Sequence, residues 1–241
     1  VFAGKETLLC TGVFGSPQLL MLSGIGPAKQ LAEHSIQCKV DLPGVGENLQ
    51  DHVECHIQIE TKQPISLNRE LQPHRMLWAG MQWFGFKKGV AAVNQCHVGA
   101  FLNSSAQTPH PDIQFHFFPV FFDKDWIPVP TTYGYRIGVG PMRPTSRGSV
   151  RLASNKVTDP LHIDPNYMST AEDFRVMREA VSLGLEIASQ PAFAPFHYRE
   201  DTPGFQIRST KQIDDFIRDD AASAYHPCGT CKMGSENDDM A

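Results

Sequence analysis

A histidine near the carboxyl end of the chain lies in the setting that acid–base chemistry needs. His226 is part of residues 225–234, YHPCGTCKMG. Pro227 stiffens the backbone after it, and Gly229 lets another group approach closely. An imidazole titrates near neutral pH, so it can take or share the proton of a hydroxyl group. We therefore predict that His226 is catalytic. The alternative is that His226 is a surface-loop histidine without a role.

Two further pairs carry reactive side chains. Asp51 and His52 are adjacent, and an acid beside an imidazole can act as a catalytic dyad. Cys228 and Cys231 have the spacing of a redox pair or of half a zinc site. The chain has no second pair of cysteines at this spacing, so we expect no metal.

Composition narrows the classes of function. Of the 241 residues, 41% are hydrophobic and 20% are charged, which is typical of a globular protein with a substantial core. The net charge of -5 offers no basic stripe for phosphates, and we expect no nucleic-acid partner. No apolar run reaches the 18 or so residues of a membrane helix. The six cysteines lack the density of a disulfide scaffold and favour a reducing compartment. We therefore expect a cytoplasmic location; the alternative is that a longer parent protein is peripheral to the inner membrane.

The first part of the chain predicts an α/β layer. Residues 4–12 read as a short apolar strand that ends at a glycine turn. Ser16 can cap a helix whose first position is Pro17 and which ends at Gly24. A second helix can begin at Pro27.

The middle of the chain predicts an antiparallel sheet followed by helices. Apolar and polar residues alternate over five separated stretches, residues 56–61, 96–102, 113–120, 135–139 and 150–153, and residues 76–86 read as a helix. Two later helices carry capping boxes, Thr170 with Asp173 and Ser209 with Gln212. The first of them places Phe174, Met177, Val181, Leu185 and Ala188 on one stripe. We predict an α+β fold, a largely antiparallel sheet with helices packed on one face, flanked by pieces of another domain.

Several motifs in this order resemble those of the glucose-methanol-choline (GMC) oxidoreductases. They are residues 12–26 (GVFGSPQLLMLSGIG), 42–52 (LPGVGENLQDH), 146–152 (SRGSVRL), 163–168 (IDPNYM) and the late histidine run. The resemblance implies a substrate domain inserted into a discontinuous FAD-binding domain. Residues 1–55 would be a fragment of the FAD-binding domain, 56–224 the substrate-binding domain, and 225–241 the return segment that carries the catalytic histidine.

The resemblance also implies a reaction and its groups. Members oxidise alcohols by passing hydride to a flavin, so FAD is the expected cofactor. The expected partner is a small alcohol, and choline is one candidate. His226 matches the catalytic histidine. His116, in IQFHFFP of residues 113–119, matches a second active-site histidine, with a half-buried strand histidine bonded to backbone as the alternative. The residues expected near FAD are Gly15, Ser16, Pro17, Asn48, Asp51 and His52; for Asp51 and His52, structural support of the flavin site is the favoured alternative to a dyad.

Substrate recognition departs from the family pattern. Choline-oxidising members hold the trimethylammonium head with aromatic faces and a glutamate, because a quaternary cation donates no hydrogen bond. Matching residues 94–101 (NQCHVGAF) to that segment puts His97 at the glutamate position. Tyr225 could supply one aromatic face. We therefore expect His97 and Tyr225 at the substrate, and an alcohol other than choline stays an alternative.

One expected element is missing from the sequence. The family seats the flavin pyrophosphate on a Gly-x-Gly-x-x-Gly loop at a helix N-terminus, and no such loop occurs in these residues. We expect the chain to be the C-terminal portion of an alcohol dehydrogenase, with no FAD bound to this portion alone. The alternative is a folded binding module without a cofactor. The electron acceptor and the oligomeric state are left open.

Overall fold

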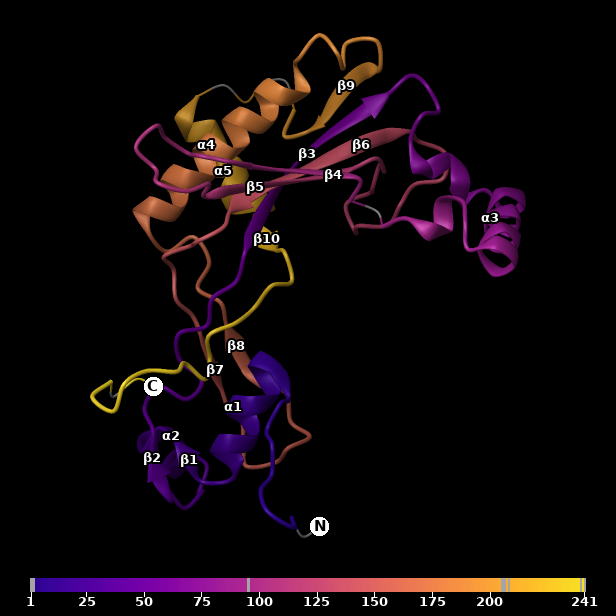
Figure 1. The fold of residues 1–241 in the computed structure, drawn as a ribbon. Coiled ribbons are helices and arrows are strands. Elements are labelled where there is room, and N and C mark those ends of the chain that lie inside the picture. Colours follow the sequence, from indigo (N-terminus) through magenta and orange to yellow (C-terminus); the bar gives the residue numbers. More distant parts are fainter. Residues whose placement is uncertain (1–2, 95, 205–206, 208, 239, 241) are drawn as a thin grey trace. The chain divides into compact units, whose positions relative to one another are not determined.

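The computed structural model describes residues 3–94, 96–204, 207, 209–238 and 240 (Figure 1). They form two compact units. Unit 1 contains Val1–His52, Pro144–Thr170 and Ala224–Ala241, and unit 2 contains Val53–Arg143 and Ala171–Ser223. The largest difference from the predicted division is that Pro144–Thr170 joins unit 1, although we expected it within the middle domain; the two other boundaries differ by one to three residues.

Unit 2 is built on a six-stranded sheet. Two short partners, β9 (His197–Thr202) and β10 (Ala222–Ser223), both pair with β3 (Val53–Thr61). Beyond β3 the order is β6 (Gly134–Pro141), β5 (Ile113–Phe118) and β4 (Val98–Leu102). Every pairing is antiparallel, which confirms the sheet that alternation predicts.

Two helices cover one face of this sheet (Figure 1). They are α4 (Ala171–Ala188) and α5 (Thr210–Asp220), which contact the strands and each other. Gly184 allows close contact, because a Cβ at this position would lie 2.4 Å from Ile57 Cδ1. Of the predicted stripe, Met177, Val181 and Ala188 are buried and Phe174 and Leu185 are half-buried; Val176, Ala180 and Gly184 complete the buried face.

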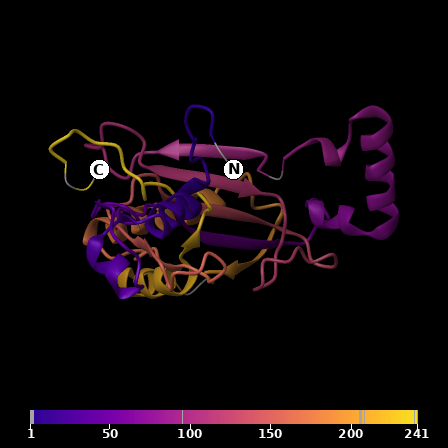
Figure 2. The same ribbon diagram turned by 90° about the horizontal axis from the view of Figure 1, so that it is seen from below.

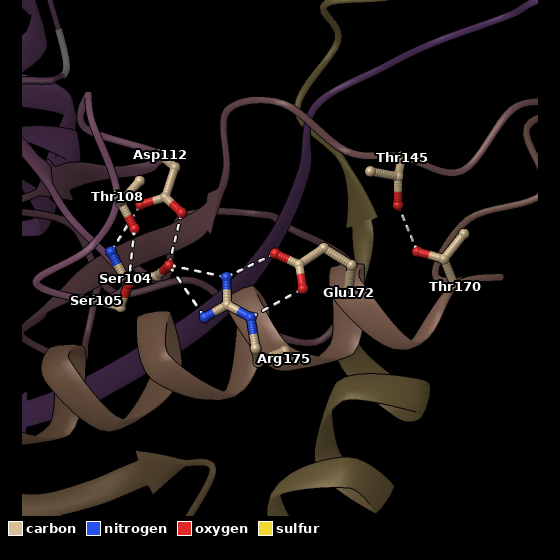
Figure 3. A network of polar contacts seen from close by, with 8 residues as sticks. All are labelled: Ser104, Ser105, Thr108, Asp112, Thr145, Thr170, Glu172 and Arg175. Carbon is tan, nitrogen blue, oxygen red and sulfur yellow. Dashed lines mark hydrogen bonds and ion pairs between the residues drawn. The ribbon is translucent and has the colours of Figure 1, made fainter.

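The ends of these helices are held by polar contacts. Ser209 and Gln212 form the predicted capping box at the start of α5. In the first turns of α4, Arg175 donates to both carboxylate oxygens of Glu172, at 2.6 and 2.9 Å, and to Ser104 Oγ at 3.1 and 3.2 Å (Figure 3). Ser104 donates in turn to Asp112 at 2.6 Å, so the loop between β4 and β5 is tied to α4.

The two faces of β3 differ in chemistry. Cys55, Ile57 and Ile59 are fully buried on the face that meets the helices. Because successive side chains alternate along a strand, Glu54, His56 and Gln58 lie on the opposite face.

A helix lies beyond one end of the sheet in unit 2 (Figures 1 and 2). It is α3 (Pro73–Phe86), which confirms the predicted helix; the short 3-10 turns η1 (Leu67–Leu71) and η2 (Val90–Ala92) flank it. Several of its large apolar side chains are exposed, among them Trp78, Phe84 and Phe86. Within the described ranges, no helix combines the length and the apolar character that crossing a membrane requires.

Unit 1 has its own small core. Its elements are α1 (Gly12–Leu22), α2 (Ala28–Glu33), a parallel pair of β1 (Ile25–Gly26) and β2 (Val40–Asp41), and an antiparallel pair of β7 (Ser149–Arg151) and β8 (His162–Asp164). Met21, Leu31 and Val45 pack with Leu152 in its core. Leu152 explains why Pro144–Thr170 belongs here, since its apolar side chain is buried among residues of the first stretch.

The strand predicted over residues 4–12 is not found. Residues 3–11 form no helix or strand, and Leu8 is 77% exposed. A strand is stabilised by ladder hydrogen bonds to a neighbour, and the structure pairs no described strand with this segment. Apolar character and a following glycine turn therefore predicted a strand that the structure does not form.

Candidate active site

Asp51 holds the backbone of the late histidine in unit 1. Its Oδ1 accepts a 2.8 Å hydrogen bond from the backbone N–H of His226, and its Oδ2 accepts a 2.5 Å bond from the hydroxyl of Tyr167. Asp51 is only 7% exposed. A buried carboxylate with a bond at each oxygen fixes the loop in one position. This geometry favours a supporting role for Asp51 over that of a reacting acid.

His52 and His226, both in unit 1, contact each other through their Nδ1 atoms. His52 Nδ1 and His226 Nδ1 are 3.1 Å apart, and the rings are nearly perpendicular at 85°. One Nδ1 must carry a proton and the other a lone pair for this bond to form. In the neutral pair, the ring that donates from Nδ1 has its lone pair at Nε2. The structure therefore brings together two of the predicted residues in a pair that presents one basic Nε2 nitrogen.

The histidine loop is paired with the segment that carries Asp51. Gln50 and Cys228 exchange backbone hydrogen bonds of 2.9 and 2.8 Å. Asn48 Nδ2 donates to the Gly229 carbonyl at 3.1 Å. Gly229 has φ +99°, and a Cβ there would lie 2.4 Å from the Asn48 carbonyl oxygen. Only glycine fits this approach, as the sequence predicted for that position.

Helix α1 begins earlier than predicted. It starts at Gly12, so Ser16 does not cap it and Pro17 lies inside it. Proline has no N–H to donate to the carbonyl four residues before it, which is that of Val13. The hydroxyl of Thr230 donates to this Val13 oxygen at 2.5 Å. Thr230, in the histidine run, thus replaces the missing helical donor and allows proline in the helix.

The start of α1 suits an anionic group. Thr11 makes no side-chain cap bond among the described contacts, and a Cβ at Gly12 would meet no atom within 4 Å. First-turn N–H groups beside open backbone fit a phosphate. Gly15 has a different use, since a Cβ there would lie 2.9 Å from Thr11 Cβ. Ser16 Oγ accepts from the Thr11 N–H at 3.3 Å.

Asn48 is occupied by protein contacts. Its Nδ2 bonds the Gly229 carbonyl, and its Oδ1 accepts from Arg147 Nε at 3.1 Å. Its φ of +60° places it in the left-handed region, where asparagine is tolerated. Asn48 therefore supports the histidine loop.

His116 in unit 2 bonds to a carboxylate. Its Nδ1 donates to Glu54 Oε1, and its side chain is 19% exposed. This bond raises the pKa of His116 above its ordinary value, against burial, which lowers it. The alternative of a strand histidine bonded to backbone did not include this acidic partner.

Glu54 is part of a buried acid–histidine cluster that the sequence did not reveal. Its Oε2 lies 3.7 Å from His56 Nε2, and His56 Nδ1 lies 3.1 Å from Asp220 Oδ2. Burial raises the pKa of Glu54, but hydrogen bonds from His116 and His56 outweigh it and lower the pKa to about 2. Burial lowers the pKa of His56, and its bonds to Asp220 and Glu54 raise it above the ordinary value. The sequence signal that could have identified this cluster is the occurrence of polar side chains at alternate positions of β3, namely Glu54, His56 and Gln58.

A cleft of about 460 Å³ lies beside this cluster. Arg136, 6% exposed, forms its wall, with its guanidinium 4.3 Å from the ring centre of Trp126 and its Nε 2.9 Å from Gln58 Oε1. Burial lowers the pKa of Arg136 to about 10, although the charges of three nearby aspartates act to raise it. Asp220 also lines the cleft. The cleft therefore combines a buried cation, an acid and an aromatic face.

The two residues predicted at the substrate are exposed. Tyr225 is 88% exposed, with φ +64°, beside His226 in unit 1. His97 is exposed in unit 2, directly before β4. The neighbouring Gln95 of the matched segment lies outside the described residues.

The cysteines of the histidine run are free thiols. Cys228 and Cys231 are both exposed. Among the described residues, no group of three or more His, Cys, Asp or Glu side chains is arranged to hold a metal ion.

Comparisons with known proteins agree with one another. Family models described as GMC oxidoreductase match residues 1–54 and 144–241. The oxygen-dependent choline dehydrogenase of Brucella anthropi is 46% identical over 239 residues, which are 99% of this chain and 44% of that protein. The protein of the same name from Proteus mirabilis is 42% identical over 241 residues, or 100% of this chain and 43% of that protein.

Solved structures show the same fold. Pyridoxine 4-oxidase from Mesorbium loti superposes with a TM-score of 0.77 at 29% identity, covering 95% of this chain and 41% of that one. A formate oxidase from Aspergillus oryzae RIB40, whose structure concerns FAD modification, superposes with a TM-score of 0.86 at 25% identity, covering 95% and 45%. The chain thus spans less than half the length of each of these relatives.

Proposed function

The chain belongs to the GMC oxidoreductase family, and we propose that a full-length protein carrying it is an FAD-dependent alcohol dehydrogenase. The reaction converts a primary alcohol to an aldehyde, which requires loss of the hydroxyl proton and of a hydride from the carbon. FAD, when bound, supplies the hydride acceptor. The chain's own residues would manage the proton and hold the substrate.

The arrangement of His226 is the observation that carries the proposal. Asp51 fixes its backbone, and His52 pairs with its Nδ1. With Nδ1 donating to His52, the Nε2 of His226 holds the lone pair that accepts the hydroxyl proton. The imidazolium formed in this way then stabilises negative charge on the substrate oxygen. His116 is proposed as the second histidine at the substrate.

FAD is proposed to meet unit 1 at the start of α1. The open backbone at Gly12 and the first-turn N–H groups suit its anionic part. Gly15, Ser16 and Pro17 belong to the same helix, and we assign them to shaping that start.

The remaining cofactor-site residues, Asn48, Asp51 and His52, are assigned an indirect part. Asn48 bonds Gly229, and Asp51 and His52 bond His226, so each of the three contacts the histidine loop. They would keep His226 in place beside the cofactor.

Choline is the first candidate substrate, because the curated relatives carry that name at 42–46% identity. A second candidate, an uncharged alcohol, is favoured by His97, which stands where choline-oxidising members are expected to have glutamate. A neutral imidazole provides no charge to offset a quaternary ammonium group. Tyr225, exposed beside His226, is proposed to contribute an aromatic face in either case.

Anaerobic mixing of the flavin-loaded full-length protein with alcohols tests the proposal. We expect choline or an uncharged primary alcohol of similar size to bleach the flavin absorbance at a saturable rate. A full-length protein that binds flavin but is reduced by no alcohol would contradict the proposed function. A full-length protein that folds without binding flavin would support the non-catalytic module instead.

A further inference from the structure

Two histidines of unit 2 flank one glycine in a row across three strands. Gly138 of β6 pairs with His56 of β3 on one side and with His116 of β5 on the other. Residues directly opposite in neighbouring strands place their side chains on the same face. His56 and His116 therefore face the same side of the sheet with an empty position between them.

The carboxylate of Glu54 occupies that empty position. A Cβ at Gly138 would lie 2.6 Å from Glu54 Oε2. From there the carboxylate accepts from His116 through Oε1 and lies near His56 through Oε2. The Glu54 side chain is 12% exposed. The glycine is thus what allows Glu54 to reach across the sheet.

His56, which lies beside the Glu54 carboxylate, is itself held by Asp220. Asp220 accepts from the backbone N–H of His56 at 2.6 Å and lies 3.1 Å from its ring Nδ1. Carboxylate and imidazole thus alternate from Asp220 through His56 and Glu54 to His116. Because both of its ring nitrogens face acids, the doubly protonated form of His56 is favoured, and in that form His56 attracts the Glu54 carboxylate.

We propose that Glu54, seated over Gly138, is a positioning residue that fixes the ring orientation and protonation of His116. An ionised carboxylate only accepts, so His116 must present Nδ1–H to it. Its Nε2 is then the nitrogen that meets the substrate. This inference rests on the proposed function, in which His116 lies at the substrate.

The charges around His116 decide the direction of its pH response. Glu54 is the acid bonded to it, while protonated His56 opposes its charge. Asp220 and Arg136 act on His56 in opposite directions, and burial and the Glu54 charge raise the pKa of the Cys96 thiol. Loss of the Glu54 charge removes the favourable partner and leaves the repulsion from His56. The pKa of His116 should then fall.

The test combines imidazole NMR with the pH profile of flavin reduction in the full-length protein. We expect Glu54→Gln to lower the pKa of His116 by about 1 unit or more, to weaken its Nδ1–H signature, and to move the corresponding limb of the pH profile in the same direction. Glu54→Asp should give a smaller shift. Glu60→Gln is the matched control, because Glu60 is on the same strand and pairs with the exposed Arg199.

Gly138→Ala provides a second variant that keeps the carboxylate but displaces it. It should move the His116 pKa in the same direction as Glu54→Gln. Unchanged His116 resonances in both variants would overturn the proposal, as would a shifted pKa with an unmoved pH profile. If the unaltered protein is reduced by no alcohol, the proposed function fails, while the NMR measurement still decides whether Glu54 controls His116.

Discussion

The hydroxyl of Thr230 donates a 2.5 Å hydrogen bond to the carbonyl oxygen of Val13, which Pro17 leaves without a donor inside α1. The two residues are 217 positions apart in the chain. This bond anchors the histidine run to the first helix of unit 1. A defect in the helical ladder is therefore the point at which the run is attached.

Thr230→Val should destabilise unit 1. The substitution keeps the shape of the side chain but leaves the Val13 carbonyl without its donor, and Thr230 is 2% exposed. An unsatisfied buried acceptor costs about 1–3 kcal/mol. Chemical denaturation of the chain should show a loss of this size in the free energy of unfolding. Thr230→Ser, which keeps the hydroxyl, is the control; equal stability of the valine and serine variants would argue against the bond.

The stability of unit 2 should decrease as the pH rises above about 6.5, the ordinary pKa of histidine. The pKa values of His56 and His116 are both raised in the folded state, so their contributions are complete below that pH and are lost as the pH rises through the raised values. Glu54 acts in the opposite direction, because its contribution is lost as the pH falls towards about 2.

Denaturation at a series of pH values checks this dependence. His56→Gln should flatten the decrease above pH 6.5, whereas His162→Gln, at an exposed histidine of β8, should leave it unchanged. The same slope in the His56 variant and the unaltered chain would show that His56 does not contribute to the decrease.

Much of unit 2 could be predicted from sequence, because its signals are local. Alternation identified β3, β5 and β6, and the box at Ser209 identified the start of α5. The start of α1 could not be predicted, since Pro17 reads as a first helical position until Thr230 is brought to Val13. The Glu54–His116 pair depends on the register of three strands around Gly138. No local pattern specifies that register.

The chain alone should bind no FAD with useful affinity. The sequence lacks the Gly-x-Gly-x-x-Gly loop that would seat the pyrophosphate. Purified chain mixed with FAD should lose the flavin on gel filtration. Retention of one flavin per chain, seen by its absorbance, would show that unit 1 is a sufficient site.

His97→Glu should favour choline over an uncharged alcohol of similar size. The new carboxylate would add charge to recognition that otherwise depends on aromatic faces, each worth about 0.5–2 kcal/mol. In the full-length protein we expect a lower KM for choline relative to the uncharged alcohol. His97→Gln, which adds no charge, is the control. A strong preference for choline before substitution, with no gain from glutamate, would place the charge partner elsewhere.

The central claim is that His226 takes the substrate proton, and the rate of flavin reduction in His226→Ala tests it most directly. The measurement uses the flavin-loaded full-length protein, mixed anaerobically with saturating alcohol, with His162→Ala as the control. Loss of an acid–base group slows a reaction by about 100-fold or more. We therefore expect the His226→Ala variant to reduce its flavin at least that much more slowly, with flavin still bound and the rate of the control unchanged. An alanine variant that reduces its flavin at the unaltered rate would contradict the account.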